Sequence, residues 1–272
     1  MKPDPLDPET IFGTFAVPAV VGSDGEVLES VSSTMDVARE RLLAGAPDGY
    51  VVLAEHQEGG RGRDGAWECP PGQGLLMSVI MRVGLSAAQQ TLVCILGAVA
   101  AAEALRQSGV RAEIKWPNDV VVATTTGGAL ALRKLGGVLV ERVVLSDAAP
   151  PFVLGIGLNV NQRAEDLLPD ATPPATSMHV EKGRIFSRVA VCREVFRHLD
   201  MWYKRLRMGQ PERILARWRR LSCLLDRTVS VRTPEGVIRG DVVGLRSSGE
   251  LIFEPETGGR MLLSDERARV LP

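Results

Sequence analysis

The alternation of apolar and polar residues along this chain of 272 residues changes period several times. Short runs rich in Val, Ile and Leu, in which apolar residues alternate or follow one another, are typical of β-strands. Turn residues, above all glycine, separate most of these runs. The pattern predicts strands at Glu26–Val31, Tyr50–Gln57, Gly74–Val83, Ala112–Val122 with a break at Pro117, Arg133–Leu145 and Phe152–Asn161, and a hairpin turn at Thr124–Leu130.

Three segments have helical spacing instead. Ser32 or Ser33 is a suitable cap for a helix from Met35 to Ala44, because a serine hydroxyl accepts a hydrogen bond from a free NH group of the first turn. The segment 86–108, which is apolar and rich in small residues, predicts a long helix. A third pattern, from Ile185 to Arg220, predicts two helices because a Gly-Gln-Pro sequence interrupts it.

The pattern changes again after about Asp226. The remaining residues form five short alternating segments joined by PEG, SSG and TGG turns, which predicts a small antiparallel barrel. We therefore expect two domains, at residues 1–225 and 226–272. Residues 1–24, which are rich in Pro, Gly and Asp, carry no firm pattern.

Composition and charge narrow the class of protein. With 45% apolar and 24% charged residues the chain is typical of globular proteins, and its net charge of −1 gives no general attraction for nucleic acid. The four cysteines lack CxxC spacing, so we expect no zinc site and no disulfide framework, and Cys94 and Cys192 read as buried thiols. No apolar run has the length of a membrane span or the setting of a signal peptide, which favours the cytoplasm.

The segment Gln57–Trp67, QEGGRGRDGAW, concentrates glycine and arginine between two predicted strands. Glycine lets the backbone approach a ligand closely, and arginine presents a planar fork of donors with a fixed charge. The spacing does not match a phosphate-binding P-loop. An RNA-binding RGG segment is an alternative, although such segments are usually repeated. We interpret the segment as an ordered loop that binds an anion.

Three further places combine polar residues with the end of a predicted element. The helix start SSTMD, from Ser32 to Asp36, fits plain capping or hydroxyls that face a polar ligand. Asn118 and Asp119 fit a turn as well as they fit a site for Mg²⁺ and phosphate. Lys134 precedes two glycines in an apolar strand, where its charge requires an anion unless solvent covers it.

Six segments, in this order, resemble those of the biotin-protein ligases: SST, GRGRDGAW, LLMSVIMR, KWPNDVVV, RKLGGVLVE and GIGLNVN. The resemblance covers residues 30–160 closely and the C-terminal part more loosely. It implies an α+β fold, with a mixed sheet and helices on one side as in class II synthetases, followed by a small SH3-like barrel. It also implies that the chain couples biotin to ATP with Mg²⁺ as biotinoyl-5′-AMP, and then transfers biotin to one lysine of a biotin carboxyl carrier protein, such as that of acetyl-CoA carboxylase.

The same resemblance implies a role for each matched residue. Cations would hold the biotin carboxylate and the α-phosphate, which otherwise repel each other. The implied residues are Arg61, Arg63 and Lys134 at these two anions; Asn118 and Asp119 at Mg²⁺–ATP, with Asp119 as a metal ligand; Ser33, Thr34, Met35 and Gln57 at biotin; Gly60, Gly62 and Gly137 where backbone comes close; Trp67 and Trp116 as apolar cover; and Asn159 beside the nucleotide. We expect the loop Glu58–Trp67 to order on binding and to exclude water.

The chain departs from the family pattern in three places. Met35 stands where the family commonly has Asn, and we expect one polar contact to the ligand to be lost. Only Ala66 lies between Gly65 and Trp67, where the family often has a basic residue, so retention of the adenylate could be weaker. The stretch Ala123–Leu132 is longer than the turn usual before this lysine.

Two alternatives stay open beside this resemblance. Lipoate-protein ligases share the superfamily and the adenylation chemistry, but they differ around the lysine and lack a loop of this type. A nucleic-acid-binding protein would use the arginine loop and the barrel, which the near-neutral charge and few aromatic residues disfavour. About 30 proline-rich residues precede SST, so we expect no DNA-binding domain and no operator binding. Family members occur as monomers and as dimers, and a homodimer stays open here.

Overall fold

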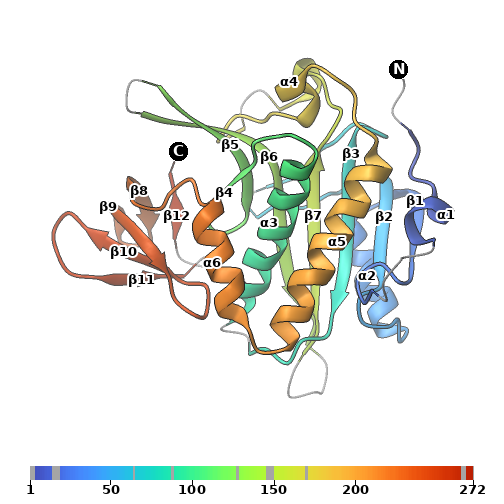
Figure 1. The fold of residues 1–272 in the computed structure, drawn as a ribbon, viewed down its shortest axis with the longest axis horizontal. Coiled ribbons are helices and arrows are strands. Elements are labelled where there is room, and N and C mark those ends of the chain that lie inside the picture. The colour runs from blue at the N-terminus through green and yellow to red at the C-terminus, as the bar shows by residue number, and fades with distance from the viewer. Residues whose placement is uncertain are drawn as a thin grey trace.

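A seven-stranded mixed sheet forms the centre of the molecule in the computed structural model (Figure 1). The structure describes residues 4–13, 19–63, 65–86, 89–126, 129–144, 150–168, 171–264 and 268–271. In spatial order the strands are β1 (Gly25–Val31), β2 (Val51–Gln57), β3 (Gly74–Met81), β7 (Phe152–Asn159), β6 (Ala129–Arg142), β5 (Asp119–Thr126) and β4 (Glu113–Lys115). The first pair is parallel and every other pair is antiparallel, so the sheet is mixed as expected.

The chain reverses between β4 and β5, at the KWPND segment. Lys115 pairs with Asp119, and the two strands are antiparallel. The peptide bond between Trp116 and Pro117 is cis. The prediction of one strand that resumes after Pro117 was therefore wrong in direction: the proline lies in a turn. Lys115 and Asp119 come to face each other because of this turn.

The β5–β6 hairpin confirms the predicted turn at Thr124–Leu130. Backbone pairing continues to Thr126 and Ala129, so the longer stretch from Ala123 to Leu132 extends both strands. Residues 127–128 lie outside the described residues, as do Leu145 at the end of the strand predicted after Arg133 and residues 87–88 of the helix predicted at 86–108.

Helices cover the two faces of the sheet unequally. Alternation along β2 sends Val51 and Leu53 into the large core, while Val52 joins a smaller cluster under α2 (Thr34–Leu43). The large core is covered by α3 (Gln90–Gln107), α5 (Arg188–Arg207) and α6 (Pro211–Leu221). Figure 1 shows these three helices in front of the sheet. The predicted helices are confirmed, including the break before Pro211.

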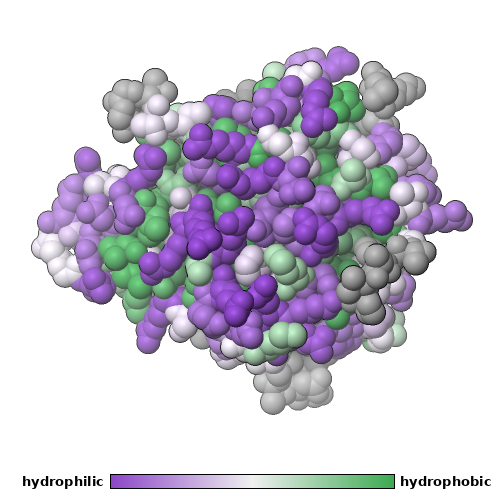
Figure 2. Space-filling view, viewed as in Figure 1, coloured by the Kyte–Doolittle hydropathy of each residue, from purple (hydrophilic) through white to green (hydrophobic). Residues whose placement is uncertain are grey.

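The helix layer is apolar inside and hydrophilic outside. The middle of α3 is buried on all sides because it consists of small and apolar residues between the sheet and the other two helices. Figure 2, in the same view, shows hydrophilic side chains over this layer. Among the described residues, no helix has both the length and the apolar character needed to cross a membrane.

Two short helices lie outside the predicted elements. The N-terminal helix α1 (Pro8–Phe12) buries Ile11 completely, and α4 (Met178–Lys182) is capped by Ser177. A 3₁₀ turn, η2, spans Ala164–Asp166. Within residues 1–24, which had no predicted structure, only 4–13 and 19–24 are described. Short helices of this kind escape detection because they hold barely one turn of periodic pattern.

A second, antiparallel sheet follows the last helix. Its strands, in spatial order, are β11 (Met261–Leu263), β10 (Leu251–Pro255), β9 (Gly236–Leu245), β8 (Thr228–Thr233) and β12 (Arg269–Val270). The predicted five strands are confirmed, and the arrangement fits the SH3-like expectation. This sheet packs against the first part of the molecule through Gly249, whose φ is +96° and where a Cβ atom would lie 3.0 Å from the backbone of Leu92.

The four cysteines are all buried and free. Burial raises the pKa of Cys69 and of Cys223 to about 12. These thiols therefore stay protonated near neutral pH and are poor nucleophiles. The prediction of buried thiols at Cys94 and Cys192 is confirmed.

Candidate functional site

A pocket lies where the start of α2 meets the glycine-arginine loop and strands β6 and β7. We call it the first pocket. Polar groups lie at one end and apolar side chains along the walls. It is lined by Ser33, Thr34, Met35, Gln57, Arg61, Gly62, Arg63, Trp67, Met77, Asn118, Lys134, Gly137, Val138, Leu139, Gly155, Ile156 and Gly157.

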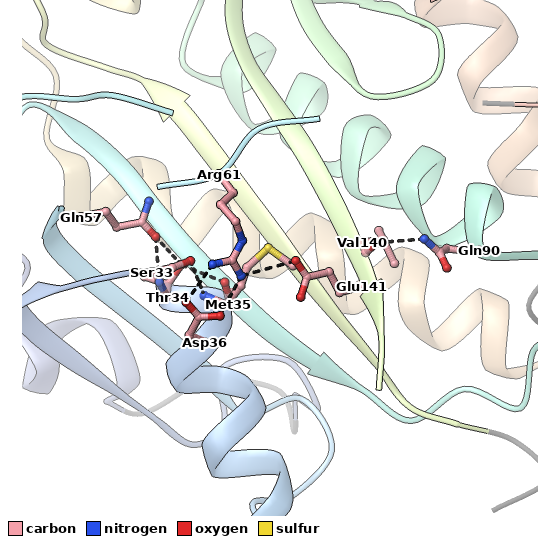
Figure 3. A network of polar contacts seen from close by, with 10 residues as sticks. Ser33, Thr34, Met35, Asp36, Gln57, Arg61, Gln90, Val140 and Glu141 are labelled. Atoms are coloured by element: carbon pink, nitrogen blue, oxygen red, sulfur yellow. Dashed lines mark hydrogen bonds and ion pairs between the residues drawn. The ribbon is translucent and has the colours of Figure 1, made fainter. Parts of the chain in front are cut away.

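The polar end of the first pocket is a connected set of hydrogen bonds (Figure 3). The backbone NH and the hydroxyl of Thr34 both contact Oε1 of Gln57, at 2.7 Å and 2.9 Å. The Thr34 hydroxyl also lies 2.8 Å from the hydroxyl of Ser78, a buried residue of β3. Ser33 caps α2, since its hydroxyl accepts from the NH of Met35. Sequence reasoning missed Ser78, although a lone serine within LLMSVIM is a usable signal.

Met35 occupies an apolar wall of the first pocket. Its side chain is buried, and a Cβ atom on Gly155 of β7 would lie 2.8 Å from the Met35 sulfur. The thioether therefore fills space that a glycine on the neighbouring strand leaves open. Met35 therefore contributes a packing contact at this position.

The glycine-arginine loop folds back on itself over the first pocket. The NH of Trp67 donates to the Gly60 carbonyl at 2.8 Å, and the NH of Gly62 donates to the Gly65 carbonyl at 2.7 Å. A side chain at Gly60 would collide with the Trp67 carbonyl, so glycine is required there. Asp64, within this loop, lies outside the described residues.

Trp67 stands between the first pocket and a second one. Its indole ring lies on Gly157, where a Cβ atom would come within 2.6 Å of the ring. The Lys134 ammonium lies 5.9 Å from the ring centroid. The indole thus separates two spaces while leaving Lys134 accessible to both.

The second pocket lies on the far side of Trp67, among loops. Gly62, Arg63, Trp67, Asn118 and Lys134 line both pockets. The second pocket is otherwise lined by Gly65, Ala66, Glu68, Lys115, Asp119, Asn159, Gln162, Asp166, Leu167, Leu168, Ala171, Thr172, Pro173 and Ala175. The wall shared by both pockets therefore carries two cationic side chains.

Asp119 lies between two lysines. One carboxylate oxygen is 2.6 Å from the Lys134 ammonium, and the other is 3.5 Å from that of Lys115. Lys115 is almost buried, at 9% exposure, and needs such a counter-ion. Sequence reasoning anticipated an anion for Lys134 but missed Lys115, whose approach depends on the β4–β5 turn.

This arrangement does not fit the expected metal ligand. A divalent cation competes poorly for a carboxylate whose two oxygens already face ammonium groups. Within the described part of the chain, no group of three or more His, Cys, Asp or Glu side chains is placed to hold a metal ion. Asp119 acts here as a counter-ion for lysine.

The side chains of Asn118 and Asn159, both expected at the nucleotide, are held by hydrogen bonds to backbone carbonyls. The Asn118 amide donates to the Val138 carbonyl at 3.1 Å. The Asn159 amide donates to the Thr176 carbonyl at 2.9 Å, and its oxygen accepts from Gln162 at 2.9 Å. Both are buried and line the second pocket, so they fix the strand ends that form its walls. Gln162 was not anticipated.

The two loop arginines point to different partners. Arg61 binds Asp36 of α2 and lines the first pocket but not the second. Arg63 lines both pockets, and its guanidinium donates to the Ala268 carbonyl of the second sheet at 3.2 Å. Arg61 and Arg63 therefore have different surroundings, although the resemblance implied the same role for both.

Trp116 does not cover the site. It is fully buried, and its indole NH donates to the carbonyl of Gly249, in the turn between β9 and β10, at 3.0 Å. It lines neither the first nor the second pocket. The expected apolar cover from Trp116 was wrong, because the β4–β5 turn directs the ring towards the C-terminal sheet.

Known proteins of similar sequence are biotin protein ligases, some of which are described as bifunctional ligase/repressors. A model of the biotin/lipoate A/B protein ligase family matches residues 27–161. A biotin–[acetyl-CoA-carboxylase] ligase of Mycobacterium tuberculosis is 33% identical over 259 residues, covering 88% of this chain and 85% of that protein. One of Paracoccus denitrificans is 30% identical over 238 residues, covering 83% and 92% respectively.

A solved structure agrees with the sequence relatives. The biotin protein ligase from Aquifex aeolicus in complex with biotin and ATP matches with a TM-score of 0.74 and 26% identity, covering 91% of this chain and 99% of that one. Both matches cover most of this chain, more than the residues 30–160 that carry the resemblance closely. The chain belongs to the biotin/lipoate protein ligase family, among its biotin protein ligases.

Proposed function

We propose that this chain is an ATP-dependent biotin protein ligase. It activates biotin as biotinoyl-5′-AMP and transfers biotin to one lysine of a biotin carboxyl carrier domain, such as that of acetyl-CoA carboxylase. The observation that carries the proposal is the wall shared by the two pockets. Arg63 and Lys134 stand where an acid in the first pocket would meet a nucleotide in the second.

The first reaction joins two anions. An oxygen of the biotin carboxylate attacks the α-phosphorus of ATP, and the bond to pyrophosphate breaks. Lys134 and Arg63 would neutralise the carboxylate and the α-phosphate as charge shifts between them, and they need no protein nucleophile. Lys134, which is paired with Asp119, would exchange this carboxylate for the substrate.

The second reaction releases AMP. The amine of the carrier lysine attacks the acyl carbon of the mixed anhydride, and the bond between that carbon and the phosphate oxygen breaks. The same two cations would stabilise the negative charge on the departing phosphate. The loop over the first pocket would limit water, which competes with the lysine for the adenylate.

The two substrates would occupy different pockets. The connected hydroxyls and amide of Thr34, Ser78 and Gln57 suit the polar head group of biotin, and the apolar walls suit its ring and chain. Trp67 would pack against the nucleotide base in the second pocket, with Asn159 at its border. Magnesium would enter bound to the phosphates of the nucleotide, since Asp119 still faces Lys115 after Lys134 turns to the substrate.

Several expectations from the sequence remain proposals. We infer two domains, residues 1–225 and 226–272, because the second sheet begins with β8 directly after that boundary. A carrier domain is the expected macromolecular partner. The absence of operator binding and a cytoplasmic location stay predictions, and the choice between a monomer and a homodimer stays open.

The testing experiment is ATP–pyrophosphate exchange with biotin, with lipoate or with neither. We expect exchange that requires biotin, and we expect Arg63→Ala to abolish it. Arg197→Ala is the matched control, because that arginine forms an ion pair with Glu194 on α5. Exchange with lipoate alone would keep the adenylation chemistry and overturn the substrate. No exchange with either acid in folded protein would overturn the proposal.

A further inference from the structure

Arg61 connects three separate parts of the molecule (Figure 3). Its two terminal nitrogens donate to the two oxygens of Asp36, each at 2.8 Å. One of these nitrogens also lies 3.4 Å from a carboxylate oxygen of Glu141. The loop is thereby joined to α2 on one side and to β6 on the other.

The two acids stand at the rim of the first pocket. Asp36 follows Thr34 and Met35, which line the pocket, and Glu141 follows Leu139 at a distance of two residues along β6. Neither acid lines the pocket itself. Figure 3 shows Arg61 between them, so its side chain spans the two walls.

The charges around Arg61 argue against its binding a substrate anion. Two carboxylates already face one guanidinium, and the fork geometry with Asp36 is bidentate. The hydrogen bond from Arg61 lowers the pKa of Asp36, so the acid stays ionised. A further carboxylate or phosphate would be repelled here.

We propose that Asp36 and Glu141 are positioning residues that hold Arg61 as a strap across the first pocket. The strap fixes the loop, which places Arg63 at the wall shared by both pockets, and it slows the escape of the bound adenylate. This inference rests on the proposed function and assigns Arg61 to loop placement rather than to the carboxylate.

The direct test is the rate at which preformed biotinoyl-5′-AMP leaves the protein. Asp36→Asn removes the charge but keeps a side chain of the same size. Because the pair is partly exposed, we expect dissociation to become about three- to fivefold faster. The rate for the unmodified protein should rise with salt concentration, and that for the variant should rise less.

A matched control lies on the same helix. Arg41 of α2 binds Glu26 of β1 with two hydrogen bonds, at 2.6 Å and 3.0 Å, away from the loop. Glu26→Gln breaks this second pair and should leave the dissociation rate unchanged. Equal rates for the Asp36→Asn and Glu26→Gln proteins would overturn the proposal.

Charge exchange distinguishes a strap from a general loss of structure. Arg61→Asp alone should speed dissociation, and Arg61→Asp combined with Asp36→Arg should restore most of the slow rate. Arg61→Gln should lower the exchange activity only in part, because Arg63 is still present but less firmly placed, whereas Arg63→Ala should abolish it. Loss of exchange in Arg61→Gln as complete as in Arg63→Ala would overturn the strap. Absence of a biotin adenylate in the unmodified protein would instead overturn the proposed function.

Discussion

The first and second pockets are held in different ways. In the first pocket, Thr34, Gln57 and Ser78 bind one another, and they lie on β-strands and a helix start. On the wall shared with the second pocket, Lys134 pairs with a carboxylate and Arg63 donates to a backbone carbonyl. A substrate anion could replace either partner. The comparison teaches that recognition of the acid is built into regular structure, while the reactive cations have exchangeable partners.

The largest effect should come from removing one of the cations whose partner a substrate anion can replace. Lys134→Ala removes a preorganised cation, and we expect adenylation at saturating substrates to fall about 100-fold or more. Single-turnover formation of the adenylate measures this. Lys204→Ala is the control, since Lys204 forms an ion pair with Asp200 at 2.7 Å on α5. A similar loss of adenylation in the Lys134→Ala and Lys204→Ala proteins would contradict a specific role for the cations of the shared wall.

A change in the hydrogen-bonded end of the first pocket should weaken biotin binding and leave the rate of adenylation almost unchanged. Thr34→Val removes the hydroxyl that Gln57 and Ser78 share. We expect roughly tenfold weaker biotin binding, because the buried Ser78 and the half-buried Gln57 each lose a partner. Titration calorimetry with biotin and with ATP measures the two affinities separately. An equal fall in ATP affinity would contradict the assignment of biotin and ATP to different pockets.

A change at the boundary should affect both pockets. Gly157→Ala places a Cβ atom 2.6 Å from the Trp67 ring, so the ring must move. We expect affinities for biotin and for ATP each to fall about fivefold, in line with the cost of overpacking. Gly84→Ala is the control, because a Cβ atom there has no neighbour within 4 Å. Unchanged affinities would show that Trp67 is not the partition.

The smallest effect concerns stability and pH. Arg61 lowers the pKa of Asp36 below its ordinary value of 3.8. Since the folded pKa is the lower one, this contribution to the free energy of unfolding is complete above 3.8 and is lost as pH falls through the folded value. Denaturant titrations of the unmodified and Asp36→Asn proteins should therefore differ near pH 6 and converge near pH 2. A constant difference would contradict this.

Sequence reasoning found most of the fold because the strands and helices are long enough to show their period. It also singled out Lys134, Thr34 and Gln57, each inside a short contiguous motif, and the structure places all three around the first pocket. What it could not find depends on contacts between distant segments. The partner of Arg61 is 25 residues earlier in the chain, and the second acid is 80 residues later.

Direction was the other source of error. The proline in KWPND marks a break, but periodicity does not say whether the chain continues or reverses there. The reversal brings Lys115 to Asp119 and directs Trp116 away from the site. The β4–β5 turn thus determines the surroundings of Lys115, Trp116 and Asp119.

The contact between Arg63 and the Ala268 carbonyl joins residues 205 positions apart. During synthesis, the glycine-arginine loop leaves the ribosome long before Ala268, whose carbonyl accepts the hydrogen bond from Arg63. A nascent chain that already contains every residue of the shared wall still lacks this contact. The contact that holds Arg63 therefore forms only after the last strand of the second sheet has emerged, later than every side chain of the shared wall.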